Sequence, residues 1–239
     1  MPKLLRMKDK SDDYVIKKKD LDSVPFRTII SGKSGLGKTS LIGSLLCLPD
    51  FYGSIFKGDN IFIFSPMKND FKMEKIIEYK KIPKENLFTQ YNDNKLNDIY
   101  DELVEKFEER IADKKKPENS LILLDDISFS GALKSGLYNA INRVFMNGRK
   151  QNISIMLSSQ KYSQISTGQR SNASSIFFYN SSMKEKELFE TDSNYKESKK
   201  EFFKMLSSNL KNKRDFIYVN YSAEDMSEIY RNTNFEIIH

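Results

Sequence analysis

Gly32-Lys33-Ser34-Gly35-Leu36-Gly37-Lys38-Thr39-Ser40 is the stretch that decides the fold of this chain. It matches the phosphate-binding loop pattern, in which a glycine, four variable residues and Gly-Lys are followed by Ser or Thr. Residues 26–31 before it are apolar and β-branched and predict a buried strand, and the apolar spacing of residues 39–48 predicts a helix. In that context the loop N–H groups and the helix N-terminus favour an anion. We therefore predict a site for ATP, with Lys38 at the β- and γ-phosphates and the Thr39 hydroxyl on Mg²⁺.

The composition is that of one α/β domain with additions. The chain has 239 residues, of which 38% are hydrophobic and 12% aromatic, enough to form a buried core. Its single cysteine, Cys47, and single histidine, His239, exclude a disulfide framework and a Cys/His zinc site. No apolar segment reaches transmembrane length and the charged first ten residues lack a hydrophobic stretch, so we expect no membrane contact and no secretion.

The charge balance leaves two explanations open. Lys and Arg number 39 against 33 Asp and Glu, which gives a formal net charge of +6 and favours an anionic partner such as nucleic acid. The richness in Lys, Asn and Ile with little Arg is also what an AT-rich genome would produce. The lysine run at residues 17–19 likewise reads as a solvated tail or as a DNA contact.

Strands and helices alternate along most of the chain, which predicts an α/β fold with a central, mostly parallel sheet and helices on both faces. The core strands are expected at residues 26–31, 60–65, 120–126, 152–159 and 175–180, with an edge strand at 87–89. Beyond the first helix, helices are expected at residues 71–81, 94–115 and 132–146, and a polar loop at 161–173.

The chain divides into three parts. Residues 1–25 form a charged N-terminal arm, residues 26–190 the nucleotide-binding core, and residues 191–239 a small C-terminal α+β extension. Around and within the extension, residues 183–191 and 195–210 predict helices, and residues 215–221 alternate as a strand expected to pair as a hairpin with residues 228–238. The extension matches no motif, so its role stays open at this stage.

Two consecutive acids end the apolar run of residues 120–124. An acid at the end of such a strand is typical of a Walker B motif, so we expect Asp125 to hold Mg²⁺ through water. Asp126 is then placed to polarise the attacking water as the catalytic base. The alternative for Asp126 is a cap of a turn or helix at the strand exit, a position that Asp favours.

Gln160 and two arginines complete the candidate catalytic set. Gln160 would sense or orient the γ-phosphate if the strand before it lies between the strand of the phosphate-binding loop and the Walker B strand, and is otherwise an ordinary loop residue. Arg149 precedes the same strand, at the edge opposite the phosphate-binding loop, so it is placed to reach a neighbouring subunit's nucleotide as an arginine finger. Such a finger contributes on the order of 10³–10⁵ in rate. Arg170 is the alternative finger or a DNA contact.

These motifs together resemble those of the genome-packaging ATPases of large DNA viruses and their virophages, the poxvirus-type branch of the FtsK–HerA superfamily. The resemblance covers residues 26–180 and is carried by the phosphate-binding loop, Leu123-Leu124-Asp125-Asp126, Asn147-Gly148-Arg149-Lys150, Ser159-Gln160 and Gln169-Arg170-Ser171-Asn172. The short chain is most similar to virophage members. Many relatives end the Walker B motif in Asp-Glu, whereas this chain has Asp126 in the second position. The Asp side chain is shorter than that of Glu, so the identity of the catalytic base stays open at this stage.

The resemblance implies an ASCE-type P-loop core and a homo-oligomeric ring, a pentamer or hexamer, with ATP sites at its interfaces. It implies Walker A roles for Lys38 and Thr39, the sensor role for Gln160 and the finger role for Arg149. It further implies double-stranded DNA driven through the pore into a capsid, capsid proteins as partners, and a location in the host cytoplasm or viral factory, including association with the virion.

Other functions are compatible with the same motifs. A HerA-like helicase or a conjugation pump would be a related motor with a different task. A P-loop nucleoside or nucleotide kinase would need an arginine-bearing lid, which this arginine-poor chain does not show. A non-catalytic assembly protein gated by nucleotide would bind ATP without turning it over.

Overall fold

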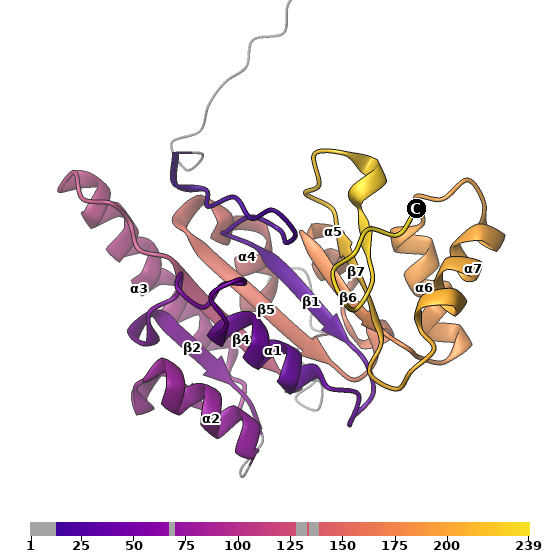
Figure 1. The fold of residues 1–239 in the computed structure, drawn as a ribbon. Helices are drawn as coiled ribbons and strands as arrows, with labels where there is room; N and C mark the ends of the chain where they lie inside the picture. The colour runs from indigo at the N-terminus through magenta and orange to yellow at the C-terminus, as the bar shows by residue number, and fades with distance from the viewer. Residues whose placement is uncertain (1–12, 67–69, 128–132, 134–138) are drawn as a thin grey trace, which may run out of the picture.

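A computed structural model of the chain describes residues 13–66, 70–127, 133 and 139–239 (Figure 1). Its strands form one sheet and are β1 (Arg27–Ser31), β2 (Ile61–Phe64), β3 (Leu87–Phe88), β4 (Ser120–Asp125), β5 (Ile153–Ser159), β6 (Ser175–Tyr179), β7 (Phe216–Asn220) and β8 (Tyr230–Arg231). Its α-helices are α1 (Lys38–Cys47), α2 (Phe71–Lys80), α3 (Asp93–Ala112), α4 (Ala140–Asn147), α5 (Thr167–Asn172), α6 (Met183–Ser193) and α7 (Lys199–Asn209).

The eight strands lie in the order β3-β2-β4-β5-β1-β6-β7-β8. All neighbours from β3 to β6 pair in parallel, which confirms the predicted mostly parallel sheet. Strand β5 lies between β1 and β4, so that Ile155 faces Arg27 on one side and Ile122 on the other. Because parallel strands end at the same edge of a sheet, the ends of β1, β5 and β4 are neighbours there. This is the strand order on which the predicted γ-phosphate sensor role of Gln160 depends.

Helices cover both faces of the sheet, with α1 and α2 on one face and α3 and α4 on the other (Figure 1). The core strands are buried on both sides, as their continuous apolar runs predict. In β4, Leu121 and Leu123 pack in the cluster that contains α1 and α2, whereas Ile122 and Leu124 pack with α3 and α4. Alternate residues of β4 therefore belong to two separate cores, one on each face of the sheet.

The C-terminal part of the chain continues the same sheet. Strand β7 pairs antiparallel with β6, and β8 pairs back with β7, with Tyr218 opposite Arg231 and Val219 opposite Tyr230. The predicted C-terminal hairpin is thereby confirmed. Phe202 of α7 belongs to the same buried cluster as α3 and α4. Residues 191–239 thus share both a sheet and a core with residues 26–190.

The N-terminal residues 13–25 are anchored by a buried aspartate. The Asp22 carboxylate accepts hydrogen bonds from the hydroxyls of Ser174, Ser175, Tyr52 and Tyr218 at distances between 2.6 and 3.2 Å. Burial raises the pKa of this carboxyl, although the four hydrogen bonds act to lower it. The donors come from segments far apart in sequence, so this cluster ties the arm to the turn after α1, to β6 and to β7.

One expectation is corrected and another lies partly outside the described residues. Residues 161–173, expected to be a polar loop, contain α5, which begins with a capping box between Ser166 and Gln169. A helix of six residues is too short to show an apolar period, so the pattern did not reveal it. The predicted helix 132–146 falls in part on residues 132 and 134–138, which the structure does not describe, and its described part is α4.

Two surface observations bear on possible partners. Lys17 of the lysine run forms an exposed ion pair with Glu224 at 2.7 Å. An exposed ion pair of this kind contributes roughly 0–1 kcal/mol to stability, so Lys17 can exchange Glu224 for another anionic partner. Among the described helices, none has the length and apolar character needed to cross a bilayer.

Candidate nucleotide site

The phosphate-binding loop joins β1 to α1 at the edge where the parallel strands end. Gly37 caps the N-terminus of α1 with a φ of 109°, in the left-handed region that favours glycine. Gly32 is required for a different reason, because a Cβ on it would lie 2.6 Å from the Cβ of Tyr179 on β6. The glycines let the loop turn tightly against the sheet and start α1 with N–H groups that have no intrahelical acceptor.

Lys38 is the first residue of α1, and its side chain folds back into the loop. Its Nζ donates to the carbonyl oxygens of Gly32 at 2.6 Å and of Lys33 at 3.4 Å. Burial lowers the pKa of this ammonium group, while the nearby carboxylates of Asp126 and Asp125 act to raise it. The Nζ is thus held at the loop, where a phosphate group would lie.

Asp125 is the last residue of β4 and only 4% exposed. One of its carboxylate oxygens accepts a hydrogen bond from Ser158 of β5, and the other accepts one from Ser65, directly after β2, at 3.3 Å. Burial raises the pKa of this carboxyl and the charge of Asp126 raises it further, against the Ser158 hydrogen bond and Lys38. Ser158 lies on β5 and Ser65 directly after β2, the two strands that flank β4, so the serines fix the orientation of the carboxylate.

Asp126 leaves the strand with a φ of 51°. This region is sparsely populated for residues other than glycine and costs on the order of 1–3 kcal/mol, which structures tolerate mainly at functional sites. The Asp126 N–H contacts the backbone oxygen and the hydroxyl of Ser158 at 3.3 and 3.2 Å. Its carboxylate accepts a hydrogen bond from Gln160 Nε2 at 2.5 Å. The structure thus brings Asp126 and Gln160, two of the predicted site residues, into contact.

These groups line a cavity of about 400 Å³ between the phosphate-binding loop and the ends of β4 and β5. Sequence reasoning missed four other residues of its lining, which are Asp70, Phe71, Lys72 and Arg214. Asp70 caps α2 and accepts a hydrogen bond from the Thr39 hydroxyl at 3.4 Å, and Lys72 donates to the Ser40 hydroxyl at 2.7 Å. Asp70 had a signal, as the acid just before a predicted helix, whereas Arg214 had none.

The oxygen atoms around Thr39 suit a hard cation such as Mg²⁺. The Thr39 hydroxyl and the carboxylates of Asp70 and Asp125 face the same cavity. Mg²⁺ prefers oxygen ligands and is usually bound through one or two carboxylates together with substrate phosphates and water. Across the described part of the chain, no group of three or more His, Cys, Asp or Glu side chains forms a metal cage. The donors therefore fit a cation that arrives with a triphosphate.

Arg149 lies at the sheet edge opposite this cavity. It belongs to a 3₁₀ turn, Gly148–Gln151, that precedes β5, and its side chain is exposed. Burial lowers the pKa of Arg27 at the start of β1, and the positive charge of Arg149 lowers it further. Arg149 thus stands beside the beginning of β1, away from the phosphate-binding loop that follows its end.

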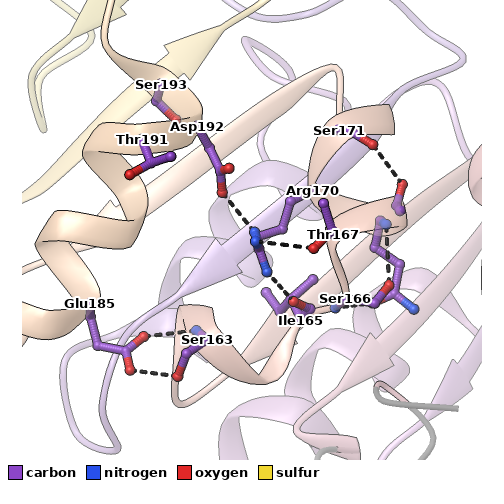
Figure 2. Close-up of polar contacts among 12 residues, drawn as sticks. Ser163, Ile165, Ser166, Thr167, Arg170, Ser171, Glu185, Thr191, Asp192 and Ser193 are labelled. Atoms are coloured by element: carbon purple, nitrogen blue, oxygen red, sulfur yellow. Dashed lines mark hydrogen bonds and ion pairs between the residues drawn. The ribbon is translucent and has the colours of Figure 1, made fainter.

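Arg170 is held within the chain, as Figure 2 shows. Its Nε donates to Asp192 of α6 at 2.7 Å and its Nη1 to the Ile165 carbonyl at 2.5 Å, and only 9% of the side chain is exposed. Next to it, Glu185 of α6 accepts hydrogen bonds from the N–H and hydroxyl of Ser163 at 2.8 and 2.7 Å (Figure 2). These contacts join α5 and the turn before it to α6.

Nearly the whole chain is similar to one known family. A model of the family described as Poxvirus A32 protein matches residues 14–236. The chain belongs to the poxvirus A32 protein family. This confirms the resemblance to the poxvirus-type branch that the motifs indicated. Among curated protein sequences, no match is found for this A32-family chain.

Solved structures of a viral NTPase share the fold of this A32-family chain. The genome packaging NTPase B204 from Sulfolobus turreted icosahedral virus 2 in complex with AMP has a TM-score of 0.59 at 13% identity, covering 90% of this chain and 98% of that chain. Its AMPPCP complex has a TM-score of 0.55 at 14% identity, covering 87% and 96%. B204, the DNA-packaging ATPase from Sulfolobus Turreted Icosahedral Virus, has a TM-score of 0.57 at 15% identity, covering 90% and 99%. At these identities the likeness establishes a shared fold.

Proposed function

We propose that this A32-family chain is an ATP-driven double-stranded DNA translocase that packages a viral genome into a capsid. The observation that carries the proposal is the convergence of Lys38, the Asp125–Asp126 pair and Gln160 at the ends of three adjacent strands. Family membership and the fold shared with the B204 packaging NTPase support the same function. The net charge of +6 is consistent with an anionic substrate.

Five residues that line the cavity would act in ATP hydrolysis. Mg²⁺ would neutralise charge on the β- and γ-phosphates, held by the Thr39 hydroxyl and, through water, by Asp125. Lys38 binds the same phosphates from within the loop. The Asp126 carboxylate takes a proton from the attacking water as the water oxygen bonds to the γ-phosphorus and the bond to ADP breaks. Gln160, whose amide donates to Asp126, orients that water.

The catalytic arginine is proposed to come from the next subunit of a ring, either a pentamer or a hexamer. Arg149 is exposed at the edge opposite its own loop, which suits contact with a neighbour's ATP. Arg170, bound to Asp192 and the Ile165 carbonyl, is proposed to stabilise the packing of α5 on α6 instead. Mixing Arg149→Ala with Lys38→Ala subunits should restore part of the activity. Full activity of Arg149→Ala alone would remove its role.

ATP hydrolysis with and without double-stranded DNA tests the proposal. We expect DNA to stimulate hydrolysis by the assembled chain at low salt and Lys38→Ala to abolish it, while Lys106→Ala, an exposed position on α3, retains it. The logarithm of DNA affinity should fall with that of salt concentration at a slope of about −0.9 per neutralised phosphate. An assembled protein that DNA does not stimulate would contradict translocation. Strand separation would instead indicate a HerA-like helicase, and phosphate transfer to a nucleoside would indicate a kinase.

The partners that follow from this function are double-stranded DNA, further copies of the chain and capsid proteins. The expected place of action is the host cytoplasm or viral factory, with the protein associated with virions during or after packaging. Fluorescence microscopy of infected cells together with immunoblots of purified virions checks this expectation. A signal confined to host compartments without viral DNA would contradict it.

A further inference from the structure

Two exposed apolar side chains stand beside the two halves of the proposed catalytic site. Phe71, the first residue of α2, is 66% exposed and lines the cavity that contains Lys38 and Asp126. Met146, near the end of α4, is 44% exposed and is followed by the turn that carries Arg149. Single exposed apolar residues are common on protein surfaces, so the positions of these two carry the argument rather than their exposure.

Phe71 and Met146 lie on surfaces that one chain cannot bring together. Helix α2 covers one face of the sheet and α4 covers the other (Figure 1). Phe71 is also at the edge where the parallel strands end, whereas the turn with Arg149 precedes β5 at the opposite edge. Two different surfaces of one molecule can pair only head to tail between copies, and repeated pairing of this kind closes into a ring when the rotation allows it.

The surface around Met146 is basic. Arg143, Arg149 and Lys150 are exposed beside it, on α4 and the turn that follows. Arg143 pairs with Asp101 of α3 at 2.6 Å, but both of these side chains are exposed, and such a pair is weak enough to exchange for another acid. We call Arg143, Met146, Arg149 and Lys150 the α4 face.

The surface around Phe71 offers acids. Glu74 and Glu78 are exposed on α2, at spacings from Phe71 that place all three on one side of the helix. The lysines beside them have contacts within the chain, since Lys72 donates to a hydroxyl of α1 at 2.7 Å and Lys75 lies 4.4 Å from the centre of the Phe71 ring. We call Phe71, Glu74 and Glu78 the α2 face.

We infer that the α2 face of one copy of the chain docks on the α4 face of the next, with Phe71 against Met146 at the centre. The inference rests on the proposed function and adds which surfaces form the subunit contact. If Arg149 enters a neighbour's cavity, the residues around it must lie against those around the mouth of that cavity. A thioether packs favourably on an aromatic ring, and the opposite charges of the two faces favour this pairing over the contact of two like faces.

Blocking each face in turn tests the inference. Phe71→Arg sets a cation against the basic α4 face, and Met146→Glu sets an acid against the acidic α2 face. Tyr195→Arg and Met183→Glu are the matched controls, because both residues are exposed in the C-terminal part of the chain. Analytical ultracentrifugation with a slowly hydrolysed ATP analogue, with and without a short DNA duplex, measures association.

Each face variant should associate at least about 30-fold more weakly than the wild type, as expected for a residue at the centre of an interface, and each control within about twofold. Wild-type association of either face variant, or an equal loss in its control, overturns the inference.

Mixing the two face variants separates a blocked surface from a damaged fold. Each variant keeps the face that the other has lost, so the mixture contains one intact contact, between the α2 face of Met146→Glu and the α4 face of Phe71→Arg. We expect the mixture to form dimers with one copy of each variant and nothing larger, while each variant alone stays monomeric at the same concentration. A mixture that stays monomeric overturns the inference.

Failure of the proposed function has a different signature. Association that follows the expected pattern, in a wild type whose hydrolysis DNA does not stimulate, overturns the function alone. A DNA-stimulated wild type whose face variants associate normally overturns the inference alone. A wild-type chain that stays monomeric with DNA and the ATP analogue overturns the inference together with the proposed ring.

Discussion

Replacing Arg170 with alanine should destabilise the fold rather than remove a catalytic group. The guanidinium pairs with Asp192 at 2.7 Å and donates to the Ile165 carbonyl at 2.5 Å, with the two charged side chains 9% and 24% exposed. Removing one partner of a buried ion pair costs about 3–5 kcal/mol because the other charge is left uncompensated. Since a quarter of Asp192 faces water, we expect about 2–3 kcal/mol of unfolding free energy. In a chain of this size that corresponds to a Tm lower by about 4–12 °C.

Thermal unfolding of four proteins measures this effect: wild type, Arg170→Ala, Asp192→Ala and the double variant. The double variant should lose less than the sum of the single variants, because neither charge is then left without its partner. Below its Tm, Arg170→Ala should hydrolyse ATP as the wild type does, whereas Arg149→Ala should keep the wild-type Tm and lose hydrolysis. An Arg170→Ala protein with normal Tm and no hydrolysis would refute this reasoning and return Arg170 to the role of the finger.

Three further results are expected. The raised pKa of Asp22 means that the folded state keeps a proton that the unfolded state has lost. The free energy of unfolding should therefore fall as pH rises through the folded pKa. Urea titrations at several pH values should show this fall in the wild type and not in Asp22→Asn. Gly32→Ala should lower the free energy of unfolding by about 1–3 kcal/mol, because its Cβ would meet Tyr179 Cβ at 2.6 Å, and a wild-type denaturation midpoint would disprove that contact. Asp126→Asn should bind ATP normally in calorimetry and lower the hydrolysis rate about 10²-fold or more, and undiminished turnover would exclude it as the base.

The parts of the site that could be predicted carry their signal in local sequence. The phosphate-binding loop and the acid pair after an apolar strand each contain their pattern within a few residues. The consecutive order of strands and helices likewise predicted a parallel sheet. The sequence did not predict that β5 lies between β1 and β4, because strand order depends on crossover connections that the sequence does not display. The role of Gln160 could therefore be stated only on the condition of that order.

The parts that could not be predicted depend on tertiary contacts. Arg214 approaches Gly37 because β7 adds to β6, which brings a loop near the end of the chain beside the first helix. The Asp192 partner of Arg170 lies 22 residues further along the chain, on α6, so the sequence did not show that this candidate finger forms an internal ion pair. The contact of Gln160 with Asp126 also required the fold, since each residue alone was compatible with an ordinary loop or cap.

Strand β5 lies between two residues that are proposed to act in different ATP sites, Gln160 in the site of its own subunit and Arg149 in that of a neighbour. Its seven residues are all buried, and residues 155–158 pair with β1 on one side and β4 on the other, with Arg149 in the turn before the strand and Gln160 directly after it. At about 3.3 Å per residue it spans about 23 Å, a length that a paired strand cannot change. Spin labels at Lys150 and Lys161 should therefore keep one separation in every nucleotide state, and a separation that varies would disprove this rigidity. In the proposed ring, β5 would therefore hold the glutamine of one ATP site and the arginine of the adjoining site at a fixed separation.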